Sequence, residues 1–331
     1  GSTNATGTSA RFNGPAGIAI GGSNLYVADT SNHMIRKIVI ATGAVTTIAG
    51  STSYGSTNGT GTSAKFKYPH GITSDGTNLY VTDSSNHTIR KIVISTGAVT
   101  TLAGSVGSTG STNATGTAAR FSSPDGIVTD GTNLYVTDRS NHTIRKIVLS
   151  TGAVTTLAGS AGSTGSTNAT GTAARFKYPR GIAIDGTNLY VSDTDNHMIR
   201  KIGLTGTVTA AVKMHNLDDD TDAVVSIASS DTGEATVSPA TLTFTENNWN
   251  TDKTVTVTGV NDTDRDRHQA YKISLSAADQ EMENPEVTTL AGSSSGFAEG
   301  TGTSAKFQNP LGVISDGTNL YVADRHNHRI R

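Results

Sequence analysis

Hydrophobic and polar positions alternate in short runs along this chain, and the same order of runs returns five times. In the first unit, residues 18–20 and 25–28 are apolar runs joined by a Gly/Asn turn. After a polar loop come the runs 34–40 and 44–48, joined by a Thr-Gly turn. Short runs of β-branched and aromatic residues separated by such turns predict antiparallel strands. We therefore expect four strands in each unit and name them a to d in chain order.

The repeat has a nearly constant period. The string N-L-Y-V-[AST]-D begins at Asn24, Asn78, Asn133, Asn188 and Asn319. The first four starts lie 54 or 55 residues apart, whereas the fifth follows after 131, which is one repeat plus 76 further residues. A fixed period with one interruption predicts a repeat array that carries an insert. Because each four-stranded unit is apolar on both faces, radial packing into a propeller is favoured over an open solenoid.

The motifs of the repeat resemble those of a known family. The pattern G-[IV]-x-x-D-x-x-N-L-Y-V-x-D-x-x-N-H-x-I-R-K-I, with A-[RK]-F-x-x-P before it and V-T-T-[IL]-A-G after it, is similar to the NHL repeat of β-propeller proteins in its bacterial secreted form. The resemblance implies an all-β, five-repeat NHL-type β-propeller with four-stranded blades. The last blade is expected to be incomplete, because the fifth copy reaches Arg331 inside its third strand.

The insert lies in the turn between strands c and d of the fourth unit. Its residues 235–262, A-T-V-S-P-A-T-L-T-F-T-E-N-N-W-N-T-D-K-T-V-T-V-T-G-V-N-D, resemble the Calx-β module, an Ig-like small β-sandwich. This predicts blades 1–4 in residues 1–206, an inserted Calx-β-like β-sandwich in 207–286, and the end of blade 4 with a partial blade 5 in 287–331. Within the insert, strands are expected at 207–212, 223–228, 240–245, 254–260 and 271–275.

Composition narrows the classes of function. The formal net charge is −2 with acidic and basic residues mixed, which argues against nucleic acid as a partner. The absence of Cys excludes disulfides, thiolate metal sites and Cys nucleophiles. No apolar run approaches the roughly 20 residues of a membrane-spanning helix, so no membrane insertion is expected. Abundant Thr, Ser, Gly and Asn favour an extracellular or cell-surface bacterial location, with the periplasm as the alternative.

The motif D-x-x-N-H after strand b contains groups that a metal site or an acid–base site would need. It recurs in every copy, as Asp29, Asn32 and His33 do in the first. Catalysis needs one asymmetric cluster, so a repeated motif predicts hydrogen bonds that stabilise loops. By the same reasoning, Arg36 and its equivalents are expected to brace adjacent blades rather than bind phosphate.

Positions that differ between otherwise similar copies are the better candidates for ligand contact. They precede strand a or lie in the loop between strands b and c, and both sets are expected on one face around the axis. No recognisable metal or catalytic-triad spacing joins the two histidines among them. The candidates are Lys67, Tyr68, His70, Asp125, Arg139, Lys177, Tyr178, Arg180, Arg325 and His326.

Two acidic clusters in the insert are candidates for Ca²⁺, the one cofactor that the sequence suggests. Alternating carboxylates can converge on Ca²⁺, and the Calx-β resemblance points the same way. Against this, Arg265 and Arg267 can neutralise the second cluster, and the EF-hand pattern is not met. A solvated turn is therefore the favoured interpretation, and Ca²⁺ binding is the alternative. The residues are Asp218, Asp220 and Asp222, and Asp262, Asp264 and Asp266.

Three functional hypotheses follow. The first is a non-catalytic extracellular scaffold, adhesion or assembly module, whose partner is a protein, either a second copy or another surface protein. In this hypothesis another chain completes the open blade, giving filaments or surface arrays. The second is a glycan- or peptide-binding propeller that uses the variable loop face. The third and least favoured is a metal-dependent lyase or lactonase, so we predict that the chain is not an enzyme.

Overall fold

The chain folds into two compact units. The computed structural model describes residues 1–204, 207–212, 223–226, 235–239, 241–244, 253–259, 286–315 and 319–331. The propeller unit comprises Gly1–Asp185, Leu189–Ile202 and Glu286–Arg331, and the insert unit comprises Gly186–Asn188 and Gly203–Pro285.

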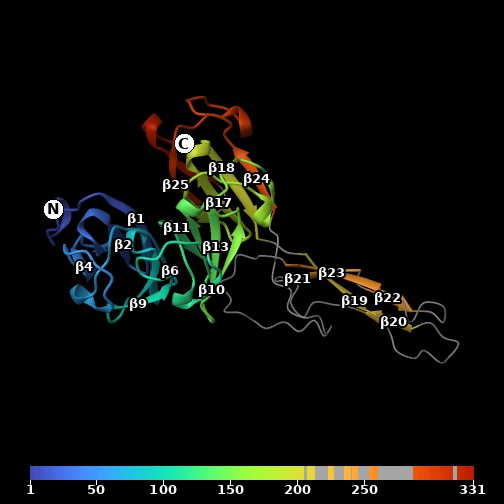
Figure 1. The fold of residues 1–331 in the computed structure, drawn as a ribbon, viewed down its shortest axis with the longest axis horizontal. Helices are drawn as coiled ribbons and strands as arrows, with labels where there is room; N and C mark the ends of the chain where they lie inside the picture. The colour runs from blue at the N-terminus through green and yellow to red at the C-terminus, as the bar shows by residue number, and fades with distance from the viewer. Residues whose placement is uncertain are drawn as a thin grey trace. The chain divides into compact units, whose positions relative to one another are not determined.

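Each repeat of the propeller unit forms one antiparallel sheet, called a blade, whose strands pair in chain order (Figure 1). Blade 1 holds β1 (Pro15–Gly21), β2 (Asn24–Asp29), β3 (Met34–Val39) and β4 (Val45–Gly50). Blade 2 holds β6 (Pro69–Ser74), β7 (Asn78–Asp83), β8 (Thr88–Val93) and β9 (Ala98–Ala103). Blade 3 holds β11 (Pro124–Thr129), β12 (Asn133–Asp138), β13 (Thr143–Val148) and β14 (Ala153–Ala158). These four-strand blades confirm the predicted a-to-d order.

The insert interrupts blade 4 without breaking its sheet. This blade holds β16 (Pro179–Ile184), β17 (Asn188–Asp193), β18 (Met198–Gly203) and β24 (Glu286–Ala291). Strand β24, which follows the insert, pairs with β18 before it, so that Ile202 lies opposite Val287. Blade 5 has three strands, β25 (Pro310–Ser315), β26 (Leu320–Asp324) and β27 (Arg329–Ile330). The prediction of an all-β, five-blade propeller with an incomplete last blade is confirmed.

A short fifth strand at the edge of blades 2 to 4 was not predicted. Strands β5 (Gly59–Thr60), β10 (Ala114–Thr115) and β15 (Ala169–Thr170) pair with β9, β14 and β24. Each lies in a Gly/Ser/Thr-rich segment and leads into a three-residue 3-10 turn, the only type of helix in the described residues. Residues with low strand propensity pair here because side chains of the same repeat hold the segment in place, as described below.

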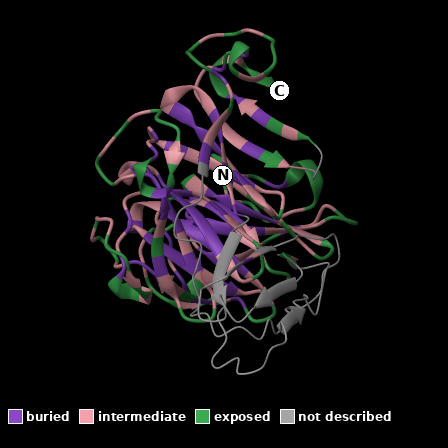
Figure 2. Cartoon of the chain, turned by 90° about the vertical axis from the view of Figure 1, so that its right-hand side faces the viewer, coloured by how far each residue is buried: buried purple, intermediate pink, exposed green. Residues whose placement is uncertain are grey.

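The hydrophobic core lies between successive blades. Strands β1, β6, β11, β16 and β25 lie against one another in that order. Between blades 2 and 3, Tyr80 and Ile89 of one blade pack on Phe121, Ile127 and Leu134 of the next. Burial of each such side chain contributes roughly 1.5–3 kcal/mol. Figure 2 shows that the buried residues gather where the blades meet.

The described strands of the insert unit form two sheets. One contains β19 (Thr207–Val212), β23 (Lys253–Gly259) and β21 (Ala235–Ser238), and the other contains β20 (Ala223–Ser226) and β22 (Thr241–Phe244). The expected strand at 271–275 lies outside the described residues. So do the six aspartates proposed as Ca²⁺ ligands.

Candidate functional site

The D-x-x-N-H motif forms a buried hydrogen-bond network in each blade. In blade 2, Asp83 Oδ2 accepts from Asn86 Nδ2 at 2.8 Å and from Arg90 Nη1 at 2.9 Å. Its Oδ1 accepts from the Lys67 amide at 2.7 Å. The side chains of Asp83 and Arg90 are fully buried, and burial raises the pKa of Asp83 to about 6 despite these donors. The motif therefore holds the loop, as its repetition predicted.

The repeated arginines brace their own repeat rather than adjacent blades, so that prediction was wrong. Besides Asp83, Arg90 donates to the carbonyls of Lys65 and Thr57 and to Asn58 Oδ1. All these groups precede strand a of the same repeat. The guanidinium thus fastens the Gly/Ser/Thr-rich segment to the sheet, which explains the short edge strand β5.

The histidine of the motif is the residue that joins neighbouring blades. His33 Nδ1 accepts from the Tyr68 amide of the next blade at 3.2 Å. The same bond links His87 to Ser123, His142 to Tyr178, and His197 to Asn309, at 3.1–3.2 Å. Burial lowers the pKa of all four histidines, which keeps the ring neutral and able to accept.

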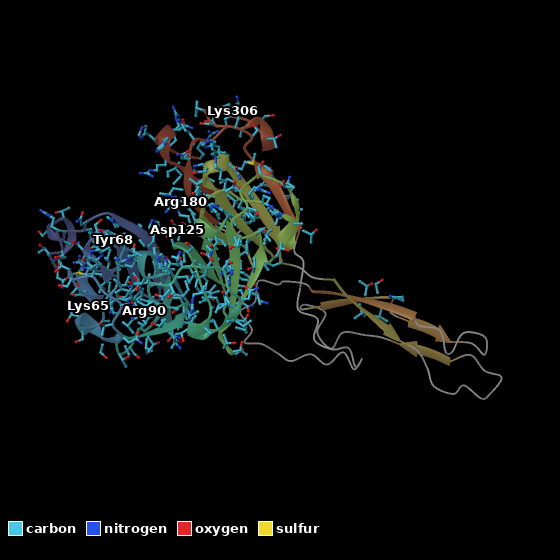
Figure 3. All side chains as sticks on the ribbon, in the orientation of Figure 1. Lys65, Tyr68, Arg90, Asp125, Arg180 and Lys306 are labelled. Carbon is cyan, nitrogen blue, oxygen red and sulfur yellow. The ribbon has the colours of Figure 1, made fainter. Side chains whose placement is uncertain are left out.

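Three of the variable side chains meet at the start of the inner strands. His70 Nδ1 lies 2.8 Å from Asp125 Oδ1, and Arg180 Nη1 lies 3.4 Å from Asp125 Oδ2. They are the second residues of β6, β11 and β16, which follow one another around the propeller. Figure 3 shows Asp125 and Arg180 next to each other. The structure thus joins positions that lie 55 residues apart in sequence.

More charges surround Arg180. Burial lowers its pKa, Asp125 opposes that shift, and the positive charges of Arg139 and Arg325 lower the pKa further. Asp195, in the same loop face, acts to raise it. We call Asp125, Arg139, Arg180, Asp195 and Arg325 the loop-face cluster. It combines three guanidinium groups with two carboxylates.

Two tyrosines at the variable position before strand a have an unusual backbone conformation. Tyr68 and Tyr178 have φ values of 52° and 49°, in the left-handed region that bulky residues avoid. Their rings meet the rings of His33 and His142 edge-on, with centroids 4.6 Å apart. The Arg139 guanidinium carbon lies 5.6 Å from the Tyr178 ring centroid. Both tyrosines therefore present rings at the blade junctions on the loop face.

The remaining candidates lie in the same loops. The amides of Lys67 and Lys177 donate to the motif aspartates of their blades. Burial is the largest cause of the lowered pKa of His197, and the charges of Lys177 and His326 lower it further. Sequence reasoning missed Tyr54, which packs edge-on against His33 with a centroid distance of 5.6 Å. It lies in a low-complexity segment, where only its aromatic character marks it.

The described residues contain neither a metal-binding group nor a membrane-spanning helix. No group of three or more His, Cys, Asp or Glu side chains that could hold a metal ion occurs there. None of the helices in that part of the chain is long and apolar enough to cross a membrane.

Comparison with known proteins supports the repeat. Residues 66–92 match the family model of the NHL repeat. Human NHL repeat-containing protein 2 is 32% identical over 163 residues, covering 45% of this chain and 22% of that protein. The chloroplastic protein SUPPRESSOR OF QUENCHING 1 of Arabidopsis thaliana is 33% identical over 154 residues, covering 43% and 14%. The chain thus spans less than a quarter of the length of either relative.

A solved structure shares the fold. An auxiliary nutrient binding protein from Bacteroides thetaiotaomicron aligns with a TM-score of 0.50 at 13% sequence identity. The alignment covers 96% of this chain and 68% of that one. At this identity the likeness concerns the fold alone.

Proposed function

We propose that the propeller is a non-catalytic interaction module that binds a glycan or a peptide on its loop face. An extracellular or cell-surface location, favoured by the composition, is part of this proposal. The observation that carries it is the contrast between two sets of polar groups. The repeated Asp, Asn and Arg side chains form hydrogen bonds within the fold, whereas variable side chains converge in the loop-face cluster.

The two tyrosines add to this proposal. A residue with a side chain in the left-handed region costs roughly 1–2 kcal/mol relative to its usual conformation. Blades 1 and 5 fill the equivalent position with Gly14 and Asn309, which adopt this conformation more easily. All five repeats adopt this conformation but do not require a bulky residue in it. Residues that retain such strain cluster at functional sites. We therefore expect the rings of Tyr68 and Tyr178 to contact the bound partner.

The test is binding of the purified chain to a glycan array and to a peptide library, compared with the double variant Tyr68→Asn with Tyr178→Asn. Asparagine is the residue that the chain itself uses at this position in blade 5, so the variant keeps the backbone conformation. We expect affinity for the selected ligand to fall at least about tenfold. Tyr321→Ala, which removes an exposed tyrosine from another surface, should bind like the wild type. Unchanged binding by the double variant, or no wild-type binding in either format, would contradict the proposal.

A second candidate function is assembly of copies through the end blades. Ile18 and Ile20 are 60% and 66% exposed, whereas Ile72, the equivalent of Ile18 in blade 2, is 6% exposed. At the other end, Ile314 and Ile330 are 64% and 73% exposed. The face of blade 1 that carries Ile18 corresponds to the face by which blade 2 packs on blade 1. The face of blade 5 that carries Ile314 and Ile330 corresponds to the face by which a blade packs on the one that follows it.

These two faces are therefore complementary in the way that successive blades are. Blade 5 of one copy can pack on blade 1 of another, and a neighbouring chain can add a strand at the edge of the three-stranded blade 5. The contact is head-to-tail, so it produces filaments or arrays when it does not close into a ring. This supports the assembly hypothesis with a surface that can be mutated.

A further inference from the structure

The junction between blades 3 and 4 differs from the other junctions at the first residue of the b–c loop. Elsewhere a hydroxyl occupies this position and donates to the proline carbonyl that begins the next blade. Thr30 donates to Pro69 O at 2.7 Å, Ser84 to Pro124 O, and Thr194 to Pro310 O at 2.8 Å. In blade 3 the position is Arg139, and Pro179 begins the next blade. A hydrogen bond between blades has here been replaced by a guanidinium.

The hydrogen-bond donors of the Arg139 guanidinium are not paired with other described residues. Its Nε atom is buried and has no hydrogen-bond partner among the described residues, as is also true of the repeated arginines. Unlike theirs, its Nη groups make no hydrogen bond to a described residue either. Within that part of the chain no carboxylate oxygen lies within 4.0 Å of it, whereas Arg180 of the same cluster is paired with Asp125. Its one ring contact is with Tyr178. A buried donor without a partner is costly, and a ligand that accepts from it removes that cost.

The charges around Arg139 favour an anion as that ligand. The positive charges of Arg139 and Arg325 both act on Arg180, so Arg180 lies within electrostatic range of each of these two guanidinium groups. Of the two carboxylates in the cluster, Asp125 is already engaged by both His70 and Arg180. The cluster therefore keeps excess positive charge in a partly buried setting, where an incoming anion is attracted strongly.

We infer that Arg139, Arg180 and Arg325 bind a carboxylate group of the ligand, an inference that rests on the proposed function of the same face. The planar fork of a guanidinium matches a planar carboxylate with two parallel hydrogen bonds. Asp125 beside Arg180 shows that this cluster accommodates a carboxylate. A uronic acid unit of a glycan and an acidic side chain of a peptide share this chemistry.

Titration calorimetry at low ionic strength tests the inference with two probes, trigalacturonate and a pentaglutamate peptide. The key variant is Arg139→Ser, because Ser84 is the chain's own residue at the equivalent position and its hydroxyl donates to Pro124 O. We expect at least one probe to bind and Arg139→Ser to weaken that binding at least about tenfold. Added salt should also weaken it. The thermal midpoint of the variant should not fall, since a hydroxyl can again reach the proline carbonyl.

Lys146→Ala, which removes a positive charge from the middle of β13, is the matched control and should bind like the wild type. Preference for one probe identifies the source of the carboxylate, and either preference supports the inference. Absence of binding to both probes, unchanged binding by Arg139→Ser, or equal competition by inorganic sulfate overturns it. If the tyrosine double variant loses its array ligand while Arg139→Ser retains it, the proposed function stands and only the carboxylate inference fails.

Discussion

Single residues of one repeated motif perform two separate tasks. Asp83, Asn86 and Arg90 close a buried network within their own repeat, whereas His87 reaches the amide of Ser123 in the next blade. The first task could be predicted, because a motif that is present in every copy cannot mark a single active centre. The second could not, since the sequence does not show which amide of the next blade faces the imidazole.

The histidine links predict a pH dependence of stability. The folded-state pKa of His87 lies below its unfolded value near 6.5, chiefly because of burial and then because of Lys67. Between these two values the unfolded chain binds more protons, so this contribution is complete above about pH 6.5 and is lost as the pH falls below it. Protonation removes an acceptor whose bond contributes about 0.5–1.5 kcal/mol. Thermal midpoints of His87→Asn should therefore decrease less than those of the wild type between pH 7.5 and 5.5.

His328→Asn provides the control, because His328 is exposed and has the same left-handed backbone at φ 55° but no blade after it in this chain. Its midpoints should follow the wild-type slope. The buried aspartates have pKa values raised to about 6, so their contribution to stability increases as the pH falls below that value. They are present in all three proteins and therefore do not affect the comparison. Parallel curves for wild type and His87→Asn would show that the imidazole does not link the blades.

At the scale of elements, the close approach of the inner strands is what creates the loop-face cluster. A Cβ atom built on Gly126 of β11 would lie 2.3 Å from the Arg180 carbonyl oxygen of β16. Gly71 stands in the same relation to the Asp125 carbonyl. Only glycine permits this spacing, which places the adjoining side chains of His70, Asp125 and Arg180 within reach of one another.

Substitution of these glycines should separate the blades. Gly126→Ala forces backbone against backbone and is expected to destabilise the chain by about 1–3 kcal/mol. Gly312→Ala is the matched control, because the nearest atom to its added methyl group is Ala323 Cβ at 3.9 Å, an ordinary contact. Urea denaturation of both variants measures the difference. Equal loss of stability would mean that the approach of β11 to β16 is not the limiting contact.

In the propeller unit each blade packs on the next through the same pair of surfaces. One surface of this pair is exposed on blade 1 and the other on blade 5. Among the described residues, no blade covers the side of blade 1 that carries Ile18 or the side of blade 5 that carries Ile330. Large apolar patches on a protein surface commonly mark interaction sites. The assembly hypothesis takes a second copy of the chain as the partner, because its end blade presents the matching packing surface.

Light scattering across a concentration series tests this assembly. The weight-average mass of the wild type should rise above the 34.0 kDa of one chain, while Ile18→Asp and Ile330→Asp should each remain at that mass. An equimolar mixture of the two variants should form dimers and nothing larger, because each retains the face that the other lacks. Val106→Asp, a charge placed at an exposed loop position, should associate like the wild type. A wild type that stays at one chain mass at every concentration would contradict the assembly hypothesis.

The sequence by itself determined the number of repeats, the strand order within each blade and the place of the insert, because periodicity and turn chemistry are local properties. From the sequence we also predict ligand contacts among the positions that differ between copies. Only the tertiary structure decided which polar groups remain available, because that depends on the partners radial packing supplies. The Nη groups of Arg90 donate to groups of its own repeat, whereas the Nη groups of Arg139 make no hydrogen bond to a described residue. Two arginines of the same type thus differ through contacts that no periodic pattern records.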